Sequence, residues 1–163
     1  MKDKLMIGER IKLEIERAPL DGGPYTGVPE EVWEGPGNSV VNPGLTLIAD
    51  LIVGDTTSGV AHMAIGSGST AVDSTDTSLV YECGRKAAST RSNVNNVITL
   101  VSTWGGNADS VTSVQIVEAG TFGHPSSGQA PLFQRVTFAA VTLADSDLLK
   151  ITLQTNIGSG TIA

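Results

Sequence analysis

The sequence predicts a mainly β fold: an antiparallel β-sandwich, jelly-roll-like, with one short helix and an extended N-terminal arm. Several short runs alternate apolar and polar residues with period two, as half-buried strands do. Gly, Ser, Thr and Val are abundant, which favours short strands and tight turns over long helices. Only one segment has the spacing and the end signals of a helix.

The N-terminal part of the chain differs in composition from the rest. Nearly half of all charged side chains lie within residues 1–34. Residues 18–24 contain two prolines and two glycines, which neither a helix nor a strand accommodates. We therefore predict two regions: an extended, partner-binding arm over residues 1–38 and a β-sandwich domain over residues 39–163.

One strand is predicted inside the arm, over residues 10–17. Ile11, Leu13 and Ile15 alternate there with charged residues, so one face of the strand is apolar. Such a strand can add to an exposed sheet edge of another subunit, or it can be an edge strand of its own sheet. On the first interpretation, the candidate partner-binding residues are Ile11, Leu13, Ile15 and Trp33.

Residues 42–54 carry the predicted helix. Asn42 is a candidate N-cap, Pro43 suits the first helical position, and Gly54 can end the helix. The apolar stripe consists of Leu45, Ile48, Leu51 and Ile52. These end signals and this spacing together favour a helix over a strand.

The remaining strands are predicted between turn signals. They are expected at residues 60–65, 79–88, 94–104, 111–118, 132–140 and 148–157. The run 94–104 is rich in β-forming residues on both faces, which is typical of a central strand. Short strands at this spacing, with long loops and a single helix, favour a sandwich.

The chain offers little of the chemistry expected of an enzyme. Residues 66–71 read Gly-Ser-Gly-Ser-Thr-Ala, a dinucleotide-like pattern, but residues 72–77 have a loop-forming sequence and do not begin the helix that would bind the pyrophosphate. His62 and His124 have no ligand-type residue at metal-binding spacing, and no Gly-x-Ser-x-Gly motif is present. We therefore expect no enzymatic activity, and we predict no catalytic residue, cofactor or metal.

Two acidic pairs leave alternatives open. Asp73 and Asp76 lie in a polar loop and could offer oxygen ligands to a hard cation, although a hydrated turn explains the same residues. Glu82 and Glu118 could form the carboxylate pair of a glycosidase, but the spacing does not place them across a cleft.

Charge, cysteine content and hydropathy exclude further classes. The formal net charge of −7 repels a phosphate backbone, so nucleic acid is not an expected partner. Cys83 is the only cysteine, which excludes an intrachain disulfide, and we expect a reduced thiol in the core. No apolar run approaches the roughly 20 residues of a membrane span, and we expect neither a transmembrane helix nor a signal peptide.

Seven motifs follow one another between residues 42 and 157. They are Asn-Pro-Gly-Leu-Thr-Leu-Ile-Ala-Asp-Leu (42–51), Met-Ala-Ile-Gly-Ser-Gly-Ser-Thr (63–70), Asp-Ser-Thr-Asp-Thr (73–77), Glu-Cys-Gly-Arg-Lys (82–86), Ile-Val-Glu-Ala-Gly-Thr-Phe (116–122), Leu-Phe-Gln-Arg-Val-Thr-Phe (132–138) and Asp-Leu-Leu-Lys-Ile-Thr (147–152). In this order they resemble the motifs of a class of tailed-bacteriophage virion proteins. The resemblance covers most of the chain but not residues 1–38.

The resemblance implies a phage structural protein, tail-fibre-like or capsid-associated, whose β-sandwich assembles into symmetric oligomers, often trimers. It carries over no catalytic residue. The acidic charge and the lack of a repetitive shaft favour a capsid decoration (cement) protein, which binds the outer shell and stabilises it. The expected partners are further copies of the chain and the major capsid protein or tail proteins, without nucleic acid or membrane. The expected location is the particle exterior, after synthesis in the host cytoplasm.

Two alternatives remain for the function. A tail, neck or baseplate protein, structural or receptor-binding, could be built on the same sandwich. A β-sandwich that binds a glycan or another small ligand, with no role in a virion, would use a pocket lined by Trp33 or Trp104.

Overall fold

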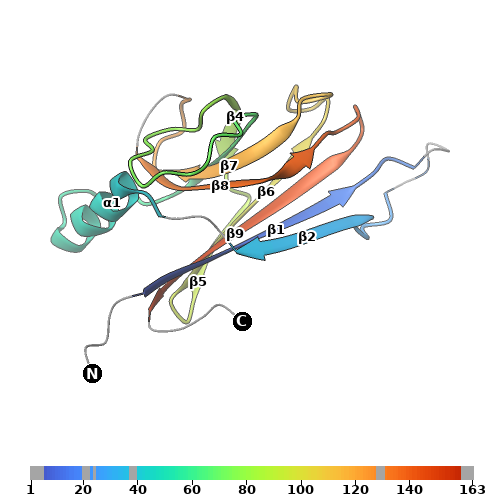
Figure 1. The fold of residues 1–163 in the computed structure, drawn as a ribbon. Helices are drawn as coiled ribbons and strands as arrows, with labels where there is room; N and C mark the ends of the chain where they lie inside the picture. Colours follow the sequence, from blue (N-terminus) through green and yellow to red (C-terminus); the bar gives the residue numbers. More distant parts are fainter. Residues whose placement is uncertain (1–5, 20–22, 24, 37–39, 128–130, 159–163) are drawn as a thin grey trace. The chain divides into compact units, whose positions relative to one another are not determined.

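A computed structural model describes the chain apart from residues 1–5, 20–22, 24, 37–39, 128–130 and 159–163 (Figure 1). Its elements are β1 (Met6–Glu16), β2 (Glu31–Pro36), α1 (Asn42–Val53), β3 (His62–Gly66), β4 (Glu82–Ala87), β5 (Thr90–Val94), β6 (Val97–Gly105), β7 (Ile116–Phe122), β8 (Leu132–Val141) and β9 (Leu148–Gly158). This described part holds two sheets and one helix, and every pairing whose register is resolved between named strands is antiparallel. The predicted mainly β class is confirmed, and two antiparallel sheets with a single short helix are consistent with the predicted β-sandwich.

The chain divides into two compact units, each with its own sheet. Unit 1 comprises Met1–Gly37, Ser89–Gln115 and Val141–Ala163, and unit 2 comprises Asn38–Ala88 and Ile116–Ala140. The strand order is β2-β1-β9-β6-β5 in unit 1 and β4-β3-β7-β8 in unit 2. The division into an arm and a sandwich domain remains a prediction; β1 and β2 themselves are strands of the unit 1 sheet.

In unit 1, β1 contains the strand predicted at residues 10–17. It pairs with β9 along its whole length and with β2 on its other edge, so that Leu13 lies opposite both Ile151 and Trp33. Ile11, Leu13 and Ile15 of β1 are buried, and the charged residues between them lie on the opposite, partly exposed face. Alternation with period two therefore sets which face of β1 is buried.

The run predicted as one strand at residues 94–104 is divided by a hairpin turn. Asn95 and Asn96 have φ values of 51° and 65°, and they join β5 to β6. A two-residue turn with both φ values positive matches the twist of a β-hairpin, and asparagine tolerates that backbone conformation better than most residues. The long prediction failed because the Asn-Asn pair was not interpreted as a turn.

The strand predicted at residues 111–118 is also displaced. The structure begins β7 at Ile116, and the preceding residues form turns in which Ser110 and Ser113 have positive φ. Val111 is buried although it lies in a turn. Its apolar character therefore reflects packing beneath a loop and not a place in a strand.

In unit 2, α1 lies at the end of the sheet where β8 begins (Figure 1). The structure corrects the predicted cap: Val41 is the N-cap, no side chain caps the helix, and Asn42 is its first residue. Gly54 ends the helix with φ of 83°, as predicted.

A buried cluster of unit 2 consists of Val41, Ala64, Leu79, Phe122 and Leu132. Among the residues that the structure describes, no helix is long and apolar enough to cross a membrane.

The single cysteine is not in the core. Cys83 lies on β4 and is half-buried, with Sγ 3.6 Å from the carbonyl oxygen of Tyr81. The expectation of a core thiol was wrong, because Cys83, like the other residues of β4, keeps part of its surface exposed.

Candidate functional site

A buried ion pair joins two neighbouring strands of unit 2. Glu118 comes from β7 and Arg135 from β8, and both side chains are fully buried. Arg135 Nε donates a hydrogen bond to Glu118 Oε2 at 2.8 Å. A charge inside an apolar strand requires such a partner, because an unpaired buried charge strongly destabilises the folded state. We call this pair and the groups that it binds the Glu118–Arg135 network.

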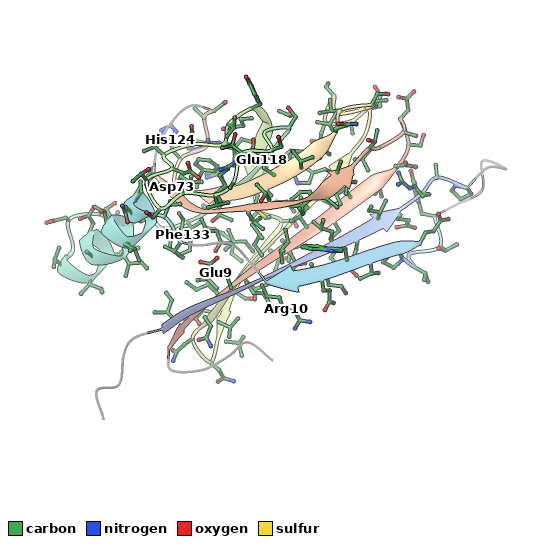
Figure 2. The ribbon with its side chains drawn as sticks, in the orientation of Figure 1. Glu9, Arg10, Asp73, Glu118, His124 and Phe133 are labelled. Atoms are coloured by element: carbon green, nitrogen blue, oxygen red, sulfur yellow. The ribbon has the colours of Figure 1, made fainter. Side chains whose placement is uncertain are left out.

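Glu118 is labelled in Figure 2. Its carboxylate accepts hydrogen bonds from both ends of the loop that joins β3 to β4. Its Oε1 accepts hydrogen bonds from the backbone N–H groups of Gly68 and Tyr81, at 2.9 and 3.0 Å. Its Oε2 accepts a third from Val80 N–H at 3.2 Å, in addition to the one from Arg135. The carboxylate therefore serves as a fixed acceptor that closes the loop.

Arg135 hydrogen-bonds to the middle of the same loop. Its guanidinium donates to Asp76 Oδ2 at 2.9 Å and to the carbonyl oxygens of Thr70 at 2.9 Å and Ala71 at 3.4 Å. Burial lowers the pKa of Arg135, but the hydrogen bonds and charges of Glu118 and Asp76 outweigh that effect, and the pKa is raised. Arg135 thus stays charged and bound to the loop.

The loop aspartates proposed as cation ligands are used within the loop itself. Asp73 Oδ1 accepts from the hydroxyl of Thr75 at 2.6 Å and from its N–H at 2.8 Å, and these hydrogen bonds lower the pKa of Asp73. Asp76 Oδ2 accepts from Arg135 and from the N–H of Asp73 at 3.0 Å. Among the described residues, no group of three or more His, Cys, Asp or Glu side chains is arranged to hold a metal ion.

A second ion pair lies on β4. Arg85 Nε and Nη2 donate to the two carboxylate oxygens of Glu82, at 2.8 and 2.7 Å. The guanidinium lies 3.5 Å from the ring centroid of Phe122, and Nη1 donates to the carbonyl oxygen of His124 at 3.0 Å. Glu82 and Glu118 are therefore each bound to a different arginine, and the structure does not use them as one carboxylate pair.

The two glycines of the dinucleotide-like pattern have a packing role. A Cβ atom on Gly68 would lie 2.6 Å from Glu118 Oε1 and still closer to the Val80 side chain. A Cβ on Gly66 would come equally near the same oxygen and would clash with the carbonyl of Tyr81. Glycine is required here because the backbone passes close to a buried carboxylate, not because it binds phosphate.

Five of the seven motifs that carry the resemblance to phage virion proteins contribute a group to one of these two ion-pair clusters. The Gly-x-Gly turn, the Asp/Thr loop, the Glu-x-x-Arg motif and the strands of Glu118 and Arg135 all contribute a group. Sequence analysis missed their contact with one another. A signal existed: in the runs Ile-Val-Glu-Ala and Phe-Gln-Arg-Val, each strand carries a single charge that needs a buried partner.

The four predicted partner-binding residues lie in the unit 1 sheet. Ile11, Leu13 and Ile15 are buried, and β1 is hydrogen-bonded on both edges within the chain. Trp33 lies on β2 and is 40% exposed. Pairing of residues 9–17 with another subunit would have to displace β2 or β9, and it remains a prediction.

Both histidines belong to unit 2. His62 is half-buried on β3, whereas His124 lies in an exposed turn, where its Nδ1 accepts a hydrogen bond from Ser126 N–H at 3.2 Å.

Two hollows in unit 1 have partly polar walls. The larger has a volume of about 870 Å³ and is lined by Arg17, Ala18, Pro19, Glu30, Thr112, Ser113, Ala144, Asp145, Ser146 and Asp147. The smaller has a volume of about 190 Å³ and is lined by Glu14, Glu16, Gly27, Pro29, Thr103, Leu148 and Lys150. Neither hollow is lined by a tryptophan, and Trp104 is only 1% exposed. Neither therefore has the tryptophan wall expected of the glycan-binding alternative.

Asp147 in the wall of the larger hollow is held by three donors. Its Oδ2 accepts from Arg17 Nη1 at 2.7 Å and from Ala144 N–H at 2.9 Å, and its Oδ1 accepts from Ala18 N–H at 3.0 Å. Burial raises the pKa of Asp147, but these hydrogen bonds and the Arg17 charge outweigh that effect and lower it. This carboxylate therefore joins the loop between β8 and β9 to the segment that follows β1.

The Glu118–Arg135 network has a structural role: its hydrogen bonds fix the loop between β3 and β4. The network holds a long loop in one conformation and leaves Val80 and Tyr81 on the surface, 41% and 68% exposed. No family model, curated protein or solved structure matches the chain.

Proposed function

We propose that this chain is a structural protein of a tailed-bacteriophage particle, a capsid decoration protein that binds the outer shell as a symmetric oligomer and stabilises it. The observation that carries the proposal is the convergence of its motifs. Four of the seven motifs, individually weak in the sequence, contribute groups to one set of hydrogen bonds in unit 2. An ordered set of residues with a common structural role supports the resemblance better than separate matches would.

The way that charge is used in unit 2 supports the same proposal. Glu118 and Arg135 are engaged by loop groups and by each other, so they stabilise a loop and are not poised for proton transfer. A loop fixed by buried hydrogen bonds suits a protein that has to present a constant surface to a regular shell. The net charge of −7 suits the particle exterior rather than contact with packaged DNA.

Tyr81 is the side chain that we expect to contact the shell. It is 68% exposed, while its backbone N–H is fixed at 3.0 Å from the buried Glu118 carboxylate. A tyrosine on a rigid backbone loses little conformational entropy when it binds a protein partner. Tyr81→Ser should weaken binding to particles without lowering the free energy of unfolding.

The proposal is tested by the copy number of the protein relative to the major capsid protein in purified particles. Quantitative mass spectrometry of whole virions supplies that ratio. A ratio near unity, within a factor of a few, supports a shell protein, and a few copies per hundred capsid subunits would instead support the tail, neck or baseplate alternative. Absence of the protein from particles would remove the virion proposal altogether.

A further inference from the structure

Helix α1 exposes the wider of its two apolar faces. Leu45, Ile52 and Val53 are 44%, 79% and 69% exposed, Ala49 is exposed and Ile48 is half-buried. At 100° per residue these five side chains form one continuous stripe, broader than the roughly 100° that an ordinary surface helix turns toward its core. We call it the α1 stripe.

The packing of α1 on β8 prevents the helix from turning this stripe inward. Gly44 lies so close to β8 that a Cβ atom there would clash with the carbonyl oxygen of Phe133. That carbonyl also accepts a hydrogen bond from Val41 N–H at 3.1 Å, at the start of the helix. Gly44 and Leu47 are the buried residues of the helix, so the opposite, more apolar side is left outside.

The size of the α1 stripe indicates a contact of limited strength. From the exposed fractions, the stripe presents roughly 400 Å² of apolar surface, the size of the largest patch on a typical monomer, which often has a function. Two such stripes bury roughly 800 Å² together, less than the about 1,200–2,000 Å² of a stable interface. The contact would therefore form reversibly at high concentration, or where many copies are held close together.

We propose that the α1 stripe is a self-association surface, on which two copies of the chain pack their α1 helices antiparallel about a two-fold axis near Ala49. The stripe is entirely aliphatic, and its spacing of three, four and seven residues is that of a helix packing on a helix. The proposal goes beyond the proposed function and does not depend on it.

Charge complementarity favours the antiparallel arrangement. The N-terminus of α1 lacks a side-chain cap, no acidic residue lies in its first turn, and no basic residue lies in its last turn. Each helix end therefore keeps its partial charge. Antiparallel packing places the positive end of one helix beside the negative end of the other. Parallel packing would place like ends together.

Sedimentation velocity of the full chain over a micromolar to millimolar concentration series tests the self-association. We expect a reversible monomer–dimer equilibrium for the unaltered protein. Ile52→Lys should weaken it about tenfold or more, because it places a charge in the contact at the most exposed side chain of the stripe. Val94→Lys is the matched control, since Val94 is an equally apolar residue, 64% exposed on β5.

Three outcomes would overturn this inference. The unaltered protein could remain monomeric throughout the series, Ile52→Lys could associate as strongly as the unaltered protein, or the assembly could contain an odd number of copies. None of these results bears on the copy number in particles, so failure here is distinguishable from failure of the proposed function.

Disulfide trapping tests the orientation of the helices. In a Cys83→Ser background, Ala49→Cys should crosslink the dimer readily, because residue 49 meets its own copy at the axis. Val53→Cys should not, because antiparallel packing separates the two copies of residue 53 by roughly 12 Å along the helix, beyond the about 7 Å that a disulfide spans. Crosslinking through residue 53 rather than residue 49 would contradict the antiparallel arrangement.

Discussion

In unit 1, the charged side chains of β1 lie on the partly exposed face of the sheet and pair along β1 and with its neighbouring strands. In unit 2, by contrast, the side chains of Glu118 and Arg135 are buried and bind a loop. Glu14 of β1 is held by Lys12 and Lys150, each at 3.0 Å, and Arg10 pairs with Glu34 of β2. The side chains of Glu118 and Arg135, by contrast, are 0% exposed.

The contrast shows where charge determines structure in this chain. An exposed ion pair contributes only about 0–1 kcal/mol, because water solvates both partners nearly as well when they are apart. A buried pair contributes modestly compared with apolar residues, but removing one partner costs about 3–5 kcal/mol, since the other charge is left without compensation. The unit 2 network should therefore be the more sensitive to mutation.

The largest effect is expected for Arg135→Met. This change leaves the Glu118 carboxylate buried with backbone donors but without its cation, and it releases Asp76 and the carbonyl groups of the loop. The free energy of unfolding, measured by urea denaturation, should fall by about 3–5 kcal/mol. Arg10→Met, which breaks the exposed pair in unit 1, should lower it by less than about 1 kcal/mol.

A double variant sharpens that comparison. Adding Glu118→Gln to Arg135→Met removes the uncompensated charge, so part of the lost stability should return. If the double variant is as unstable as the sum of the two single changes, the charge pair is not what Arg135 contributes. If Arg10→Met destabilises the protein as strongly as Arg135→Met, the contrast between the units fails.

The next effect in size is expected for Gly68→Ala. Its Cβ would approach Glu118 Oε1 and the Val80 side chain more closely than van der Waals contact allows. We expect a loss of about 1–3 kcal/mol, in the range of overpacking in a rigid site. Gly59→Ala is the control within unit 2, since nothing lies within 4 Å of a Cβ atom there. Equal stability of the two variants would show that the loop can move away from Glu118.

Much of the fold was predictable from the sequence because it is encoded locally. Alternation in the segment of Ile11, Leu13 and Ile15 defined a strand and its buried face. Gly54 ended the helix because its φ of 83° favours glycine. The errors arose where local pattern is ambiguous, as at the Asn95-Asn96 turn, whose β-rich flanks resemble one long strand.

The network was not predictable in the same way, because it depends on contacts between distant segments. Glu118 binds Gly68, which precedes it by 50 residues, and Arg135 binds Thr70, which precedes it by 65 residues. Spacing in the sequence does not reveal such pairs. The sequence did offer a charge in each of two apolar strands, which requires a partner without identifying it.

A smaller, pH-dependent effect is expected for Asp147→Asn in unit 1. The pKa of Asp147 is lowered below its ordinary value of 3.8, since the donors of Ala144, Ala18 and Arg17 outweigh burial. The stability from its ionised form is complete above the unfolded-state pKa, and it is lost as the pH falls through the lowered native pKa. At neutral pH the variant should lose about 1.5–3 kcal/mol, the range for a charged hydrogen-bond partner.

The acid limb of the stability curve is the measurement for Asp147. Urea denaturation between neutral pH and the acid range should give a shallower fall for Asp147→Asn than for the unaltered protein. Asp145→Asn serves as the control, because Asp145 is exposed and close by in the sequence. An acid limb of unchanged steepness in Asp147→Asn would show that this carboxylate does not contribute through its charge.

The smallest effect is expected for Glu14→Gln, and salt distinguishes it from the unit 2 variants. The hydrogen bond from Lys150 and then that from Lys12 lower the pKa of Glu14, but both lysines are more than a third exposed, and a loss of at most about 1 kcal/mol is expected. Salt screens exposed charges over about 3 Å at 1 M, so this loss should shrink when denaturation is repeated in concentrated NaCl. The loss from Arg135→Met should persist, because no ions reach a side chain that is fully buried. If salt reduced both losses equally, the Glu118–Arg135 network would be open to solvent, and the contrast between the two units would disappear.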